Sequence, residues 1–183
     1  EFREPVCYGQ LSLSSRYLLS PLAGFTTLPF RRIVRNIGGV GLATTDLVNC
    51  RALLEQNERT MQMIETHLQD QPFAVQIFGS DPSFMVQAAQ FLVERDVATI
   101  DINMGCPVQK IIKTGCGSAI LKDPERVFQT VKSARNETDK PLSAKIRMGW
   151  DRNDINGVAC ARAIEAGGAD WLIVHGRTRS DDY

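Results

Sequence analysis

The sequence has no long hydrophobic run and no excess of charge of one sign. None of its apolar runs approaches the roughly 18 residues that a membrane span requires, and no signal peptide opens it. The 21 Lys and Arg residues balance 21 Asp and Glu residues, so the formal net charge is zero. A chain that binds mainly through phosphate contacts is usually more basic than this. We therefore expect neither a membrane protein nor a purely electrostatic nucleic-acid binder.

Cysteine is scarce, and its few occurrences form no C-x-x-C pair. A chain of 183 residues can bury a core without disulfides, and its 43% hydrophobic content is ordinary for a globular protein. We therefore expect reduced thiols in a cytoplasmic protein, with no metal site. The cysteines are Cys7, Cys50, Cys106, Cys116 and Cys160.

Short apolar runs alternate with amphipathic segments along the whole chain. The runs predict six strands, at residues 17–19, 40–45, 73–78, 99–103, 142–147 and 171–175. Apolar residues at helical spacing predict five helices between them, over 30–37, 51–66, 84–92, 127–131 and 158–164. Asp81-Pro82 and Asp123-Pro124 each supply an N-cap followed by a proline suited to the first helical position.

This strict alternation predicts an α/β fold with a parallel sheet. Right-handed crossovers leave an open doubly wound sheet or a (β/α)8 TIM-type barrel. No G-x-G-x-x-G follows the first strand, which disfavours the dinucleotide-binding form of the open sheet. We therefore predict the barrel, but with only about six βα units, because a complete one takes roughly 250 residues. Residues 1–183 are expected to form a single domain, the N-terminal portion of such a barrel, with the last two strands missing.

Polar residues recur at or near the ends of four consecutive predicted strands. In each strand the apolar residues occupy alternate positions and leave the polar ones on the opposite face. Because barrel active sites lie at the C-terminal ends of the strands, these side chains are expected to share one cavity. Such a cavity suits an anionic or hydrogen-bonding ligand. The inward residues are Gln76, Asp101, Asn103, Lys145, Arg147 and His175.

The segment after the fourth strand, residues 104–122, is much longer than an ordinary βα connection. Gly105 and Pro107 flank Cys106 and restrict the backbone on either side of its thiol. A thiol held there could be a nucleophile, a metal ligand or a proton donor. Metal binding lacks partners at ligand spacing, and a nucleophile lacks an adjacent histidine. With an ordinary pKa near 8.5, such a thiol is mostly protonated and can act as a general acid.

Five segments, taken together and in this order, resemble the tRNA-dihydrouridine synthase family. The N-x-G-C-P element is the most specific of them, and the resemblance extends from about Tyr17 to the end of the chain. The segments are Ser20-Pro21-Leu22-Ala23-Gly24 with Leu28-Pro29-Phe30-Arg31-Arg32, Val75-Gln76-Ile77-Phe78-Gly79-Ser80, Asp101-Ile102-Asn103-Met104-Gly105-Cys106-Pro107-Val108, Lys145-Ile146-Arg147-Met148-Gly149-Trp150 and His175-Gly176-Arg177-Thr178-Arg179.

The resemblance implies an FMN-dependent, NADPH-consuming oxidoreductase that binds RNA and reduces uridine in tRNA to 5,6-dihydrouridine. It implies that Cys106 is the general acid that protonates uracil C5. The implied flavin contacts are Pro21, Leu22 and Ala23 under the ring, with Gln76, Lys145 and His175 at its polar edge. The implied substrate contacts are Asn103, Arg147 and Arg177.

The resemblance also implies parts that this chain does not contain. In the family, two further strands carry the loops that bind the FMN phosphate, and a helical domain helps to grip tRNA. Two alternatives stay open at this stage. One is an FMN barrel that acts on a free pyrimidine, of the dihydroorotate or dihydropyrimidine dehydrogenase type. The other is a non-catalytic half-barrel that self-associates through the unpaired edges of its first and sixth strands.

Overall fold

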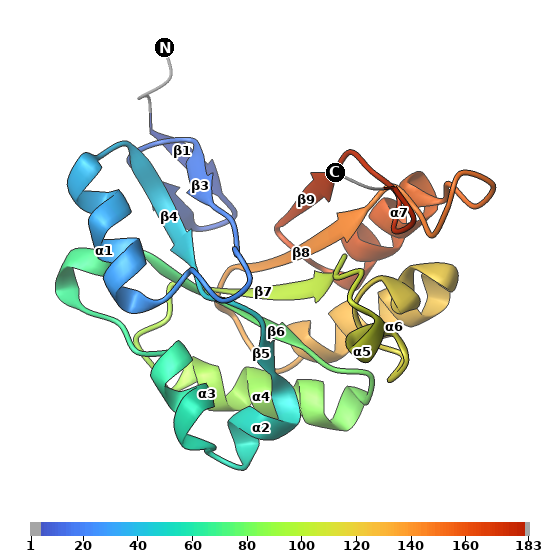
Figure 1. Cartoon of the computed structure of the whole chain (residues 1–183), viewed down its shortest axis with the longest axis horizontal. Helices are drawn as coiled ribbons and strands as arrows, with labels where there is room; N and C mark the ends of the chain where they lie inside the picture. The colour runs from blue at the N-terminus through green and yellow to red at the C-terminus, as the bar shows by residue number, and fades with distance from the viewer. Residues whose placement is uncertain (1–4, 182–183) are drawn as a thin grey trace.

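The computed structural model describes residues 5–181 and contains one curled, parallel sheet (Figure 1). All of its strand pairs are parallel, in the order β3-β4-β6-β7-β8-β9, and the short β5 pairs with the end of β6. The six predicted strands are all present, with ends that match the prediction to within one residue. The strands are β3 (Tyr17–Leu19), β4 (Val40–Thr44), β5 (Val48–Asn49), β6 (Phe73–Phe78), β7 (Thr99–Met104), β8 (Leu142–Arg147) and β9 (Trp171–His175).

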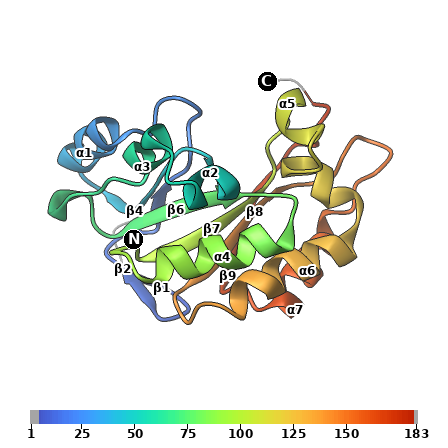
Figure 2. The same ribbon diagram turned by 90° about the horizontal axis from the view of Figure 1, so that it is seen from below.

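The longer helices lie on the outer face of the curled sheet (Figure 2). Asp81 and Asp123 cap the two helices that begin with proline, accepting hydrogen bonds from the backbone N–H groups of Ser83 and Glu125, as the sequence predicts. None of the helices in the described residues is long and apolar enough to cross a membrane. The outer helices are α1 (Leu28–Ile37), α4 (Pro82–Val93), α6 (Pro124–Arg135) and α7 (Gly157–Gly167).

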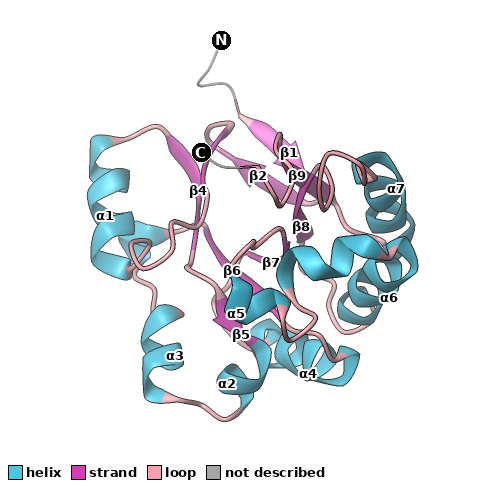
Figure 3. Ribbon diagram, turned by 45° about the vertical axis from the view of Figure 1, so that its right-hand side comes forward, coloured by secondary structure: helices cyan, strands magenta, loops and turns pink. Residues whose placement is uncertain are grey.

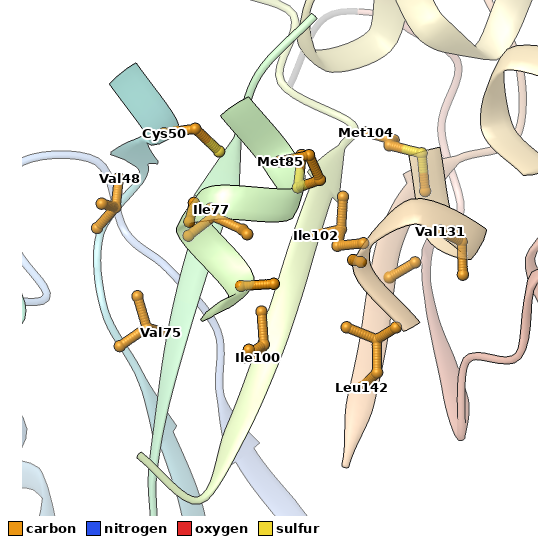
Figure 4. Packing of buried hydrophobic residues seen from close by; sticks show 14 of the residues in the cluster. Val48, Cys50, Val75, Ile77, Met85, Ile100, Ile102, Met104, Val131 and Leu142 are labelled. Atoms are coloured by element: carbon orange, nitrogen blue, oxygen red, sulfur yellow. The ribbon is translucent and has the colours of Figure 1, made fainter. Parts of the chain in front are cut away.

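The main hydrophobic core lies between this outer face and the helices (Figure 4). Val75 and Ile77 of β6 and Ile100 and Ile102 of β7 point toward it, and Met85 of α4 packs against them. All five side chains are almost completely buried. Because side chains alternate along a strand, the residues between them face the inside of the curl, as the period-2 pattern predicts.

A β-hairpin at the start of the chain covers the inner face at the N-terminal ends of the strands. It consists of β1 (Val6–Tyr8) and β2 (Leu11–Leu13), and it was not predicted from the sequence. Leu13 packs with Leu42 of β4, and the Tyr8 ring lies 5.0 Å from that of Trp171 in β9. The hairpin therefore closes one end of the half-barrel and leaves the C-terminal ends of the strands accessible.

The prediction of a single helix over residues 51–66 is wrong, because the segment is interrupted. The segment forms two short helices, α2 (Cys50–Leu54) and α3 (Glu58–Met63). Gln56 between them has a φ of 49°, which no α-helix can continue through. The Asn57 side chain then accepts a hydrogen bond from the Thr60 N–H and starts α3. Apolar residues occur on both sides of the break, at 52–54 and at 61, 63 and 64, and they did not reveal it.

A buried ion pair joins α1 to the segment before β6. Arg31 and Asp70 are both fully buried, with 2.8 Å between Arg31 Nη2 and Asp70 Oδ2. The Arg31 guanidinium also donates to the carbonyl oxygens of Thr26 and Glu65, and it stacks on the Phe73 ring. Arg31 thus joins the start of α1 to residues 65–73, a segment that lies far from it in the sequence.

We expect Arg31→Met to lower the free energy of unfolding by about 3 kcal/mol, because it removes the main partner of a buried carboxylate. Chemical denaturation followed by circular dichroism measures this loss. Arg51→Ala serves as the control, because its ion pair with Glu55 is exposed and is expected to contribute less than about 0.5 kcal/mol. Equal losses in the two variants would contradict the role given to the Arg31–Asp70 pair.

Candidate active site

A cavity of about 120 Å³ lies at the C-terminal ends of the strands. Its lining comes from β6, β7, β8 and β9 and from the loops after β3, β4 and β7. Figure 3 shows the curl of the sheet to which these strands belong. Seven of the predicted site residues line it, which confirms that those strands deliver them to one place. The lining residues are Pro21, Ala23, Asp46, Leu47, Gln76, Asn103, Gly105, Pro107, Lys145, Arg147 and His175.

A larger cavity, of about 510 Å³, lies near the opposite ends of the strands. Its charged residues Arg135 and Asp170 are paired with each other, with 3.1 Å between Nη1 and Oδ2. Arg135 also donates to the carbonyl oxygens of Thr138 and Lys140. These groups stabilise the ends of α6 and β8. We therefore place the candidate site in the smaller cavity, where barrel active sites lie.

Three predicted site residues do not line the cavity. Leu22 belongs to the loop after β3, but its side chain is 47% exposed. Arg177 follows β9 and is half-buried, and its charge acts on His175. Cys106 is 7% exposed, although its neighbours Gly105 and Pro107 both contribute to the cavity wall. The loop that carries the thiol therefore borders the cavity.

The loop after β7 holds Cys106 by several hydrogen bonds. The Cys106 carbonyl oxygen accepts from both the backbone N–H and the hydroxyl of Ser118, at 3.1 and 2.9 Å. Gly117 has a φ of 58°, and a Cβ at that position would lie 2.7 Å from the same oxygen. The long segment contains α5 (Gln109–Ile112) and the 3-10 helix η2 (Gly117–Lys122). Its second half therefore folds back onto Cys106, and glycine is required for this close approach.

Arg147 is buried, whereas most arginine side chains are solvated. Its side chain is 4% exposed, with Nε donating to the Gly105 carbonyl at 2.9 Å and Nη1 donating to the Thr178 carbonyl at 2.8 Å. It thereby ties the Cys106 loop to the loop after β9. The predicted contact between Arg147 and substrate stays a prediction.

Burial raises the pKa of the Cys106 thiol, and the negative charge of Asp46 acts in the same direction. A backbone hydrogen bond at Val108 and the positive charge of Arg147 oppose this shift. The net effect favours the protonated thiol at neutral pH, because an ordinary thiol pKa of about 8.5 already lies above it. Cys106 is therefore suited to donate a proton.

Two basic groups in the cavity have lowered pKa values. Burial lowers the pKa of Lys145, and the nearby Asp101 carboxylate opposes the shift. Burial also lowers the pKa of His175, as do the positive charges of Arg147, Lys145 and Arg177. The direction of this shift favours the neutral form of His175 at pH 7.

Asp46 is a site residue that the sequence analysis missed. Its carboxylate accepts hydrogen bonds from the backbone N–H groups of Gly24 and Leu47, at 2.5 and 2.7 Å. It therefore fixes the loop that carries Pro21 and Ala23. The signal was available, because Asp46 directly follows a predicted strand, as the other polar site residues follow theirs. Within residues 5–181, no group of three or more His, Cys, Asp or Glu side chains could hold a metal ion.

Residues 18–183 match the family profile described as dihydrouridine synthase. The chain belongs to this family. It is 40% identical over 181 residues to a probable tRNA-dihydrouridine synthase 1 from Synechocystis sp., covering 98% of this chain and 50% of that protein. It is 39% identical over 175 residues to tRNA-dihydrouridine synthase B from Pseudomonas aeruginosa, covering 96% and 52%. The chain thus spans about half the length of the curated relatives it matches.

A solved structure of a 2-naphthoyl-CoA reductase complex has the same fold, with a TM-score of 0.70 at 11% sequence identity. The match covers 98% of this chain and 41% of that one. The curled parallel sheet with outer helices confirms the predicted fold class, the first six βα units of a (β/α)8 barrel.

Proposed function

We propose that this chain carries the catalytic barrel portion of an enzyme that reduces uridine in tRNA to 5,6-dihydrouridine. The observation that carries the proposal is the meeting of Lys145, His175 and the Cys106 loop at one cavity in a member of this family. FMN as cofactor, NADPH as reductant, tRNA as RNA partner and a cytoplasmic location belong to the proposal. Self-association through the edges of β3 and β9 stays a separate prediction.

The residues present fit a flavin. Lys145 forms no salt bridge within the described part of the chain, although its ammonium group is half-buried in the cavity wall. An anionic or electron-rich ring edge would supply a direct partner in addition to the attraction of Asp101. Pro21 and Ala23 add apolar surface beside it, and His175 adds a neutral hydrogen-bonding group. Leu22 and Gln76 are the remaining expected contacts.

When bound, the flavin supplies the reducing equivalent for the C5–C6 double bond of the uracil ring. The protein itself has to hold the base in place and deliver a proton to C5. Cys106 is the proposed donor, because its raised pKa keeps the thiol protonated. Asn103 lines the same cavity as the expected contact for flavin or base. Arg147 and Arg177 are the proposed positive charges on the substrate side.

The proposal is tested in two steps. The chain is first titrated with FMN, and binding is followed by the visible absorption band and by quenching of flavin fluorescence. The chain is then joined to the second half of the Pseudomonas aeruginosa relative and supplied with FMN, NADPH and tRNA that lacks modifications. Mass spectrometry of the digested tRNA is expected to show dihydrouridine. Reduction of a free pyrimidine base to its dihydro form, in preference to reduction of tRNA, would favour the free-pyrimidine alternative instead.

A further inference from the structure

A continuous row of buried polar side chains crosses the inner face of the sheet. The strand register places Gln76 of β6, Asp101 of β7 and Ser143 of β8 directly beside one another. The Asp101 carboxylate accepts hydrogen bonds from both neighbours, at 2.5 Å from Gln76 Nε2 and 2.6 Å from Ser143 Oγ. All three residues are at most 2% exposed. Water is therefore excluded from this row.

The row continues from Gln76 to the Cys106 loop. Gln76 Oε1 accepts a hydrogen bond from Asn103 Nδ2 at 2.9 Å. Asn103 Oδ1 in turn accepts from the backbone N–H groups of Gly105 and Cys106, at 3.3 and 3.0 Å. Asp101 is thus connected to the backbone of Cys106 through two side-chain amides in series.

The direction of these hydrogen bonds is fixed at both ends of the row, by the Asp101 carboxylate, which accepts, and by the backbone N–H groups of Gly105 and Cys106, which donate. A carboxylate accepts and cannot donate, whereas the two ends of an amide group are nearly equal in size and can exchange places. With Asp101 ionised, Gln76 must turn its NH2 group toward Asp101 and its carbonyl toward Asn103. Asn103 must then turn its NH2 group toward Gln76 and its carbonyl toward the loop. In the reverse orientation, Asn103 would present a donor to two backbone N–H donors.

We propose that Asp101 is a positioning residue that holds the Gln76 amide with its carbonyl toward Asn103, the orientation that lets Asn103 accept from the loop, and thereby holds the backbone of the Cys106 loop in place. On balance burial raises the pKa of Asp101, whereas the hydrogen bonds from Gln76 and Ser143 and the positive charge of Lys145 act in the opposite direction and favour the carboxylate. The consequence for proton donation by Cys106 rests on the proposed function. The ordering of the loop does not, and it is measured without flavin, tRNA or turnover.

The test exchanges the carboxylate at position 101 and the amide at position 103, which reverses the direction of the hydrogen bonds through Gln76. In Asn103→Asp alone, two carboxylates compete for the single NH2 group of Gln76, so one acceptor loses its donor. We expect hydrogen exchange at the Cys106 amide, measured by NMR on cysteine labelled with nitrogen-15, to become about tenfold faster. Alkylation of the Cys106 thiol by iodoacetamide, followed by mass spectrometry, is expected to accelerate to a similar degree.

Adding Asp101→Asn to Asn103→Asp is expected to restore the row in the opposite direction. The new amide can donate to Gln76 Oε1, Gln76 Nε2 can donate to the new carboxylate, and that carboxylate still accepts from the Cys106 N–H. Exchange and alkylation should return to within about threefold of the original chain. A role in packing alone predicts no such rescue, because both changes preserve side-chain size.

Ser143→Ala is the matched control, since it removes a neighbour of Asp101 but leaves the acceptor for Gln76 in place. It is expected to change the Cys106 exchange rate by less than about threefold, and a tenfold change would overturn the proposal. The proposal also fails if Asn103→Asp has no effect, or if the double variant is no better than the single one. Circular dichroism melting shows whether each variant folds. If Asn103→Asp does not fold, recovery of folding in the double variant supports the proposal and its absence overturns it.

Discussion

Replacing Cys106 by alanine is expected to lower kcat for uridine reduction in tRNA by about 10²- to 10⁴-fold, the range typical for loss of a general acid. The thiol is the proposed proton source for C5, and no other cysteine is held by the same loop contacts at the cavity wall. The Michaelis constant for tRNA should change little, because a single small side chain contributes little to binding a large substrate. Steady-state rates on unmodified tRNA, in the enzyme completed with its second half, measure both quantities.

Cys116→Ala is the matched control for this prediction. Cys116 lies in the same loop and is also buried, but its neighbours Gly115 and Gly117 do not line the cavity, whereas the neighbours of Cys106 do. Its replacement is expected to leave kcat within about threefold of the original. A Cys106→Ala enzyme that keeps most of its activity would exclude the thiol as the proton donor.

The pH dependence follows from the direction of the Cys106 pKa shift. A general acid acts in its protonated form, so its contribution is complete below its pKa and is lost as pH rises through it. Because burial raises this pKa, the decline is expected above the ordinary thiol value of about 8.5. A profile of kcat against pH measures the position of this limb. A decline centred below pH 8 would show that another group supplies the proton.

Replacing Lys145 by methionine is expected to weaken FMN binding by about 10- to 100-fold. A hydrogen bond from a charged group is worth roughly 1.5 to 3 kcal/mol where its partner is removed from water. The Lys145 ammonium lies half-buried in the cavity wall and forms no salt bridge in the described residues. Fluorescence titration with FMN measures the loss of affinity.

The same replacement should have little effect on the protein without ligand. The cost of burying the ammonium and its attraction to Asp101 oppose each other, so the free energy of unfolding is expected to change by less than about 1 kcal/mol. Lys132→Met, on the exposed face of α6, is the control and should alter neither property. Unchanged FMN affinity in Lys145→Met would remove Lys145 from the flavin site.

Much of the candidate site could be predicted from the sequence because a parallel strand has a simple geometry. Alternation placed Gln76, Asn103 and Lys145 on the inner face, and the shared direction of the strands brought their ends together. The same rule could have included Asp46, which lies two residues after the end of β4. It could not show that Arg147 is buried, because its burial depends on two carbonyl groups from separate loops.

Local sequence therefore determined the strands, the capped helices, the family and the residues that face the cavity. Each of these follows from side-chain period or from a contiguous motif. Only the tertiary structure decided that the helical segment is interrupted at Gln56 and that the first hairpin covers the inner face. It also decided which way the amides of Gln76 and Asn103 point. These features depend on contacts between residues far apart in the chain. An amide has a donor end and an acceptor end, and only its neighbours in space determine which end faces which.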